Sequence, residues 1–286
     1  MSELAILYED PHLIAVNKPA PLLTQAPEGV PSLESLVKAY IKAKYAKPGG
    51  VYLGVPHRLD RPVSGAIVFA RNTKAAQRVH AQFHERLVRK VYWAMVEGTV
   101  TPEAGVWEDW LRKVPDESRT VRADANEPGA KQATLEFRVL NPIILPSPLG
   151  GEGLGVRGKL STLGEDCLPG EAFPSPLSPL PQRERGTRSF LELSPLTGRM
   201  HQLRAQTSLR GHPVLGDSAY GSARDFGPPA ELPRDRVIAL HARRLTLTHP
   251  FTKQELVIEA PLPAYWSCGP SEATPAVTPA RSASEG

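Results

Sequence analysis

The sequence contains few cysteines and no long apolar run, and both shortages exclude classes of protein. Its only cysteines are Cys167 and Cys268, too few for a disulfide scaffold and too far apart for a metal-binding motif. No stretch approaches the roughly 18 consecutive apolar residues that a membrane-spanning helix needs. The first residues also lack the basic and apolar regions of a secretory signal. We therefore expect a cytoplasmic protein with no membrane partner.

The charge balance excludes a strongly one-sided surface. Lys and Arg together number 34 and Asp and Glu together number 30, which leaves a net charge of +4. This small excess is compatible with a polyanionic partner but does not require one. Hydrophobic residues make up 41% of the 286 residues, so the chain can form a sizeable core.

Proline is abundant, with 30 residues in the chain, and it gathers in one segment. Eight prolines and eight glycines fall within residues 141–188, which show no helical or strand period and predict a disordered insert. Residues 133–139 and 189–193 alternate polar with apolar side chains, so we expect the insert at the tip of a β-hairpin. Residues 269–286 predict a disordered tail, which leaves one domain over residues 1–268.

The remaining patterns mix helices and strands. One helix is expected from Ser32 as N-cap, and a second from Thr73. The second helix is expected to carry on one face Ala76, Val79, Phe83 and Leu87. Strands are expected over residues 13–16, 65–70, 91–96, 237–248 and 256–259. Strands outnumber helices without regular alternation, which favours an α+β fold with a mostly antiparallel, mixed β-sheet and flanking helices.

Three segments carry residues suited to chemistry, although each alone has an ordinary structural interpretation. HRLDRPVSG (57–65) precedes an expected buried strand and, taken alone, favours a turn. In RKVYWAMVEG (89–98), Tyr92 can fill the core with its hydroxyl at the rim. LTGRMHQLR (196–204) can be a solvated helix start, followed by a turn at Gly216-Asp217.

Together and in this order, the segments resemble the RluA-type family of RNA pseudouridine synthases. The family motifs HRLDxxTSG, KxYxAxVxG, GRxHQ(I/L)R and GxPIxGDxxYG correspond here to HRLDRPVSG, KVYWAMVEG, GRMHQLR and GHPVLGDSAYG. The departures, at Pro62-Val63 and Met200, remove no group that the chemistry requires. The resemblance runs from Ile6 to Pro263 outside the insert. It implies a catalytic domain over residues 1–268 with a central RNA-binding cleft and no S4-like module before it.

This resemblance implies an isomerase that converts specific uridines of rRNA or tRNA to pseudouridine without a cofactor. Asp60 corresponds to the family's nucleophile, and attack on the sugar, attack on the base and a glycal-type route all stay open. Arg204 corresponds to the cation that keeps a carboxylate charged in a closed pocket. Tyr92 corresponds to the active-site tyrosine. Leu203 is equally compatible with an apolar pocket wall and with ordinary packing.

An RNA substrate also implies base flipping and phosphate contacts, because a base inside a duplex cannot reach the pocket. Arg58 is suited to filling the gap left in the stack, or equally to a phosphate contact or a surface ion pair. Arg61, Arg89 and Lys90 are further RNA-binding candidates. A broader basic cluster also contains Arg71, Lys74, Arg78 and Arg86, and a solvated helix face is its alternative interpretation. We expect a monomer.

Two other functions compete with this interpretation. A non-catalytic RNA-binding protein on the same fold is disfavoured because Asp60, Tyr92 and Arg204 are all present. A glycoside hydrolase is disfavoured because no second acidic residue accompanies Asp60. No metal is expected, since His80 and His84 lack the glutamate of a zinc-binding HExxH motif.

Overall fold

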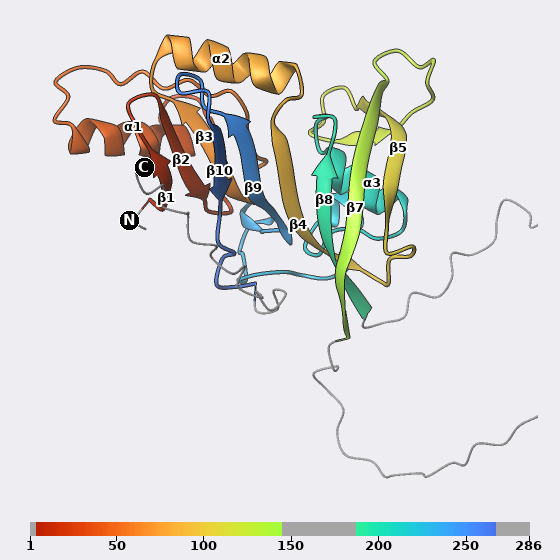
Figure 1. Ribbon diagram of the computed structural model, residues 1–286. Coiled ribbons are helices and arrows are strands. Elements are labelled where there is room, and N and C mark those ends of the chain that lie inside the picture. Colours follow the sequence, from red (N-terminus) through yellow and green to blue (C-terminus); the bar gives the residue numbers. More distant parts are fainter. Residues whose placement is uncertain (1–3, 145–186, 267–286) are drawn as a thin grey trace, which may run out of the picture.

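The computed structural model describes residues 4–144 and 187–266, which form a mixed β-sheet flanked by three α-helices (Figure 1). The helices are α1 (Leu33–Lys44), α2 (Thr73–His84) and α3 (Gln202–Leu209). The first strands are β1 (Ile6–Glu9), β2 (Leu13–Lys18), β3 (Ser64–Ala70), β4 (Arg89–Glu97) and β5 (Ala104–Lys113). The others are β6 (Thr120–Arg122), β7 (Lys131–Ile144), β8 (Thr187–Pro195), β9 (Leu240–Thr248) and β10 (Glu255–Glu259). Within the described ranges, no helix has the length and apolarity needed to cross a membrane.

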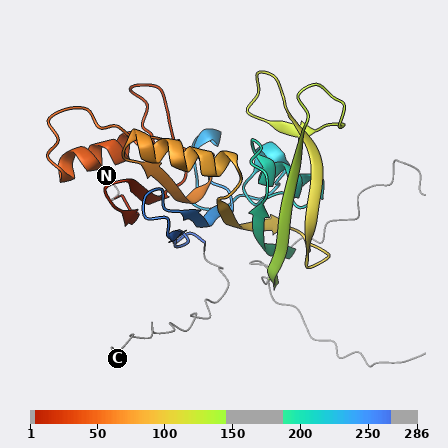
Figure 2. The same ribbon diagram turned by 45° about the horizontal axis from the view of Figure 1, so that its top comes forward.

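The sheet is mostly antiparallel, as the sequence predicts. Its strands lie in the order β1-β2-β3-β9-β4-β8-β7-β5-β6, and β10 pairs with β9. Only the β3–β9 pair is parallel among these neighbours. Figures 1 and 2 show α1 and α2 beside the half of the sheet that contains β1 to β3, and α3 beside the half that contains β8 and β7. The predicted α+β class is confirmed.

Strands β2 and β3 are covered on both faces, which explains their nearly continuous apolar sequences. One face packs in a core with α1, through Ile14, Val16, Ile67, Phe69, Leu33, Val37 and Ile41. The opposite face packs in a second core with α2, through Leu13, Ala15, Ala66, Val68, Ala75 and Val79. This double cover makes β3 a rigid support for the loop that precedes it.

The helix starts agree with the sequence, but the second helix is shorter than expected. Ser32 caps α1 in a capping box with Ser35, and Asn72 caps α2. Helix α2 ends at His84 because Arg86 adopts the left-handed conformation (φ 60°) and the Leu87 N–H donates to the Gln82 carbonyl. Leu87 was expected on the buried face of this helix. That expectation is wrong, since Leu87 lies beyond the helix and is exposed.

The predicted hairpin is present, because β7 and β8 pair antiparallel. Its strands reach further than expected: residues 141–144 and 187–188 were assigned to the insert but pair as strand. Pro142 is compatible with β7 because β5 pairs only as far as Arg138, so β7 is an edge strand at the proline. Residues 145–186 and the expected tail at 269–286 lie outside the described residues.

The strand expected over residues 237–248 begins only at Leu240. The backbone N–H groups of the two residues before Leu240 donate to other segments. The Ile238 N–H donates to the Pro62 carbonyl, and the Ala239 N–H donates to the Leu215 carbonyl. This stretch therefore ties the loop around Asp60 to the segment that holds Asp217.

Candidate active site

Asp60 lies in the loop before β3, and the backbone on both sides of it is fixed. The Thr24 hydroxyl accepts from the Leu59 N–H at 3.1 Å and donates to the Leu59 carbonyl at 2.8 Å. The Lys18 ammonium donates to the carbonyls of Pro19, Leu22 and Arg61 at 3.2, 2.7 and 3.2 Å. Burial lowers the pKa of Lys18 to about 7, against the charge of Asp60, which acts to raise it. These bonds hold Asp60 rigidly with respect to the sheet.

The close approach of β3 to β9 depends on Gly65. Its φ is +119°, and a Cβ at this position would lie 2.4 Å from the Ala242 carbonyl oxygen. A side chain here would therefore push β3 away from β9, five residues after Asp60. The glycine of the HRLDRPVSG segment is thus explained by packing rather than by a turn.

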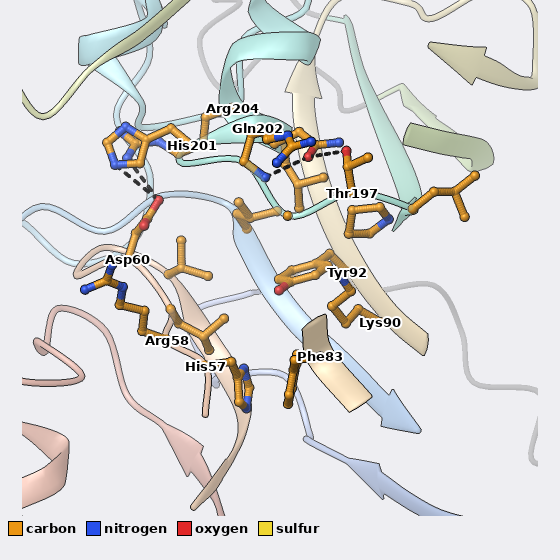
Figure 3. Close-up of a pocket in the computed structure, with 18 of the residues that line it drawn as sticks. His57, Arg58, Asp60, Phe83, Lys90, Tyr92, Thr197, His201, Gln202 and Arg204 are labelled. Atoms are coloured by element: carbon orange, nitrogen blue, oxygen red, sulfur yellow. Dashed lines mark hydrogen bonds and ion pairs between the residues drawn. The ribbon is translucent and has the colours of Figure 1, made fainter. Parts of the chain in front are cut away.

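A cavity of about 350 Å³ opens beside Asp60, a size typical of small-molecule pockets (Figure 3). Its walls come from the Asp60 loop, the end of α2, strand β4 and the segment that leads into α3. The lining includes His57, Arg58, Phe83, Arg86, Lys90, Tyr92, Arg199, His201, Leu203 and Arg204. The three sequence segments therefore meet at one pocket, as the resemblance implies.

Arg204 contacts Asp60, but its closer partner is Asp217. Arg204 Nη1 lies 3.4 Å from Asp60 Oδ2, whereas Nε and Nη2 bind the two oxygens of Asp217 at 2.6 and 2.8 Å. The Arg204 and Asp217 side chains are 8% and 1% exposed. Burial acts to lower the pKa of Arg204, but the hydrogen bonds and charge of Asp217, aided by Asp60, raise it. The predicted Asp60–Arg204 pair is thus one half of an Asp–Arg–Asp arrangement.

Asp217 was not predicted as a site residue, because Gly216-Asp217 has the pattern of a turn. Gly216 does adopt a positive φ of 83°, so the turn exists, but Asp217 also anchors Arg204. The alternative interpretation of residues 196–204 as a solvated helix start is wrong, because α3 is buried from Gln202 to Thr207. The available signal was the chemistry of the motifs: a buried arginine requires a buried anion.

Tyr92 lies on β4 beside a bulge in the pairing of β4 with β9, between Val91 and Tyr92. Bulges of this kind re-aim a side chain next to an active site. Burial, and secondly the charge of Asp60, raise the pKa of the Tyr92 hydroxyl above its ordinary value, so it is a neutral phenol at pH 7. Figure 3 shows Tyr92 and Asp60 on different sides of the pocket. Leu203 both lines the pocket and packs in the core, so both of its interpretations apply.

The predicted RNA-binding residues separate into two groups. Arg58 and Lys90 line the pocket, and Arg58 is exposed. Burial, with Arg86 close by, lowers the pKa of Lys90. Arg61 and Arg89 do not line the pocket, and they form ion pairs with Asp235 and Glu255 at 2.7 and 2.6 Å.

The residues of the broader basic cluster have different partners. Arg71 forms an ion pair with Glu9 at 3.4 Å, and Arg78 donates to the Pro250 carbonyl at 3.0 Å. Both arginines are used to join segments of the fold, whereas Arg86 faces the pocket. Whether this cluster contacts phosphates stays a prediction.

Comparison with known proteins agrees with the motifs. The profile of the family described as "RNA pseudouridylate synthase" matches residues 12–209. The chain belongs to this family. It is therefore an RNA pseudouridine synthase, an isomerase that acts on RNA, and the predicted family and activity are confirmed. Membership favours this activity over both the glycoside hydrolase and the non-catalytic alternative.

Individual relatives of this RNA pseudouridine synthase agree over most of its length. "tRNA pseudouridine synthase C" of Salmonella typhimurium is 33% identical, over 92% of this chain and 87% of that protein. "Ribosomal large subunit pseudouridine synthase C" of Rickettsia typhi is 27% identical, over 92% and 69%. The structure of "Human RNA Pseudouridylate Synthase Domain Containing 4" has a TM-score of 0.62 at 23% identity. It covers 92% of this chain and 90% of that chain, which supports the fold.

Proposed function

We propose that this enzyme converts a uridine of tRNA to pseudouridine, with Asp60 as the nucleophile. The observation that carries the proposal is a carboxylate held at the wall of a nucleoside-sized pocket by a buried, permanently charged arginine. The choice of tRNA rests on the 33% identity to tRNA pseudouridine synthase C of Salmonella typhimurium, against 27% to the ribosomal enzyme of Rickettsia typhi.

The reaction needs no cofactor because it is an internal rearrangement. The bond between N1 of uracil and C1′ of ribose breaks, and a bond from C5 to C1′ forms. One proton leaves C5 and one proton is gained at N1, so atoms and electrons balance. A carboxylate suits this sequence because it can add covalently and then leave. Asp60 supplies such a carboxylate, and its loop keeps it in place while the detached base rotates.

Two further residues complete the pocket chemistry. Arg204 places a permanent positive charge beside the nucleophile, with Nη1 at 3.4 Å from Asp60 Oδ2. Tyr92 offers its ring to the uracil face and a neutral hydroxyl for proton transfer in the later steps. Arg58 and Lys90 lie where they can contact the phosphates that flank a flipped uridine.

The test uses transfer RNA and large-subunit ribosomal RNA isolated from a strain that lacks this gene. Each RNA is incubated with the purified enzyme, and new pseudouridine is mapped by carbodiimide modification and primer extension. We expect a new pseudouridine in tRNA and none in ribosomal RNA. Product in ribosomal RNA alone would contradict the tRNA proposal. Absence of product in both RNAs would contradict the proposed activity on either class.

A further inference from the structure

His201 occupies a position that sequence reasoning did not assign. It precedes α3 with φ 52° and ψ 24°, the left-handed region, which is uncommon for residues other than glycine. Its ring lies between Asp60 and Tyr220. Nε2 is 3.5 Å from Asp60 Oδ2, and Nδ1 is 3.0 Å from the Tyr220 hydroxyl (Figure 3 labels His201 and Asp60).

The hydrogen bonds that link Thr120, Tyr220 and His201 indicate which nitrogen of His201 carries the proton. The Tyr220 oxygen accepts the backbone N–H of Thr120 at 2.8 Å, and both residues are buried. The buried hydroxyl proton of Tyr220 goes to His201 Nδ1, because among the described residues it would otherwise have no acceptor. A neutral His201 therefore accepts at Nδ1 and carries its proton on Nε2.

The imidazole is neutral at pH 7. Burial lowers the pKa of His201 below its ordinary value, and the nearby Arg204 lowers it further, while Asp60 and Asp217 act to raise it. The uncharged imidazole then carries its Nε2–H beside Asp60, with Nε2 at 3.5 Å from Oδ2.

The two carboxylate oxygens of Asp60 have different contacts. His201 Nε2 and Arg204 Nη1 both approach Oδ2, at 3.5 and 3.4 Å. Over residues 4–144 and 187–266, Oδ1 has no hydrogen-bond or ion-pair partner, and Asp60 keeps 33% of its side chain exposed. One oxygen is held from two directions, and the other is left for the substrate.

We infer that His201 is a positioning residue which, together with Arg204, holds Oδ2 of Asp60 and leaves Oδ1 as the attacking atom. The Thr120–Tyr220–His201 chain sets the tautomer that makes this possible. The inference rests on the proposed function, because it refines how Asp60 is presented to the uridine.

The kinetic test compares two substitutions of His201. Asparagine tolerates the left-handed backbone but is too short to donate to Asp60, so His201→Asn should lower kcat about 10- to 100-fold. KM for RNA should change less than about threefold, because Oδ2 is not a binding group for RNA. Glutamine places an N–H near the former Nε2, so His201→Gln should recover part of the lost kcat. Parent-like kcat in His201→Asn, or no recovery in His201→Gln, would overturn the inference.

A spectroscopic test reads the tautomer directly. In protein labelled with ¹⁵N-histidine, the His201 signals are assigned by their loss in His201→Asn. We expect a protonated Nε2 and an unprotonated Nδ1 at pH 7, and a partial shift to the other tautomer in Tyr220→Phe. A protonated Nδ1 in the parent enzyme would overturn the inference.

Asp60→Asn, assayed alongside, separates this inference from the proposed function. If Asp60→Asn still forms pseudouridine, the nucleophile assignment fails. If Asp60→Asn is inactive while His201→Asn equals the parent, only the role of His201 fails.

Discussion

The ion pair between Arg204 and Asp217 is expected to support both stability and catalysis, and Asp217→Asn tests it. Both side chains are almost fully buried, and they share two hydrogen bonds of 2.6 and 2.8 Å. Asparagine keeps the size of aspartate but carries no charge, and its amide nitrogen faces an arginine donor. Removing one partner of a buried pair typically costs about 3–5 kcal/mol, because the other charge remains buried.

We expect Asp217→Asn to lower the free energy of unfolding by about 3 kcal/mol, near the lower end of this range. The reason is that Asp60 remains as a second partner for Arg204. With Asp217 neutral, Arg204 should turn toward Asp60 and pair with it more tightly. A more tightly paired nucleophile is less reactive, so kcat should fall even where the protein is fully folded.

The assay is urea unfolding followed by circular dichroism, with single-turnover kinetics at a temperature where the variant is folded. Asp235→Asn is the matched control, because Asp235 pairs with Arg61 at the surface with 39% of its side chain exposed. The control should lose less than about 1 kcal/mol. A loss of stability in Asp217→Asn no larger than that in Asp235→Asn would show that the buried Arg204–Asp217 pair does not stabilise the fold.

Three further predictions concern other parts of the site and fold. Tyr92→Phe should lower kcat by about 100-fold with little change in RNA affinity, measured by filter binding; unchanged turnover would make Tyr92 only a stacking surface. Lys18→Met should cost about 3 kcal/mol in urea unfolding because three carbonyls lose their donor, and a loss under 1 kcal/mol would contradict this. Burial lowers the pKa of His57 to about 3 and of His241 to about 4, so the unfolded chain binds more protons below pH 6.5. Stability should therefore fall from pH 7 to pH 5 by about 2 kcal/mol for each histidine, and a constant free energy of unfolding would contradict their neutral burial.

The sequence predicts most of the half of the sheet that contains β2 and β3, because the helix caps and apolar runs there are local sequence signals. Ser32 supplies a cap, and residues 65–70 form an apolar run that becomes β3. Strand β5 was not predicted, since Trp110 and Val106 are apolar but exposed and blur the alternation around buried Trp107 and Leu111. Here tertiary packing, rather than the local pattern, decides which face is buried.

Some site residues can also be predicted from the sequence, whereas others depend on contacts between distant segments. Asp60, Tyr92 and Arg204 are found through linked motifs, and the structure brings all three to one pocket. Asp217 and His201 lie inside the same motifs, yet their partners are 13 and 141 positions away along the chain (Arg204 and Asp60). A linear pattern gives the residue types but not the hydrogen bonds that join them. For this reason, the anchoring of Arg204 and the tautomer of His201 can be inferred only from the three-dimensional structure.

The most direct test of the central claim is release of the C5 proton by Asp60→Asn. Formation of the C5–C1′ bond must expel the hydrogen at C5, so RNA made with uridine tritiated at C5 releases tritium to water on each turnover. Asparagine keeps the size and hydrogen bonds of Asp60 but removes the anionic oxygen. We predict full tritium release by the parent enzyme, and none by Asp60→Asn although it still binds the RNA. Tritium release by purified Asp60→Asn would contradict the role of Asp60 as the nucleophile.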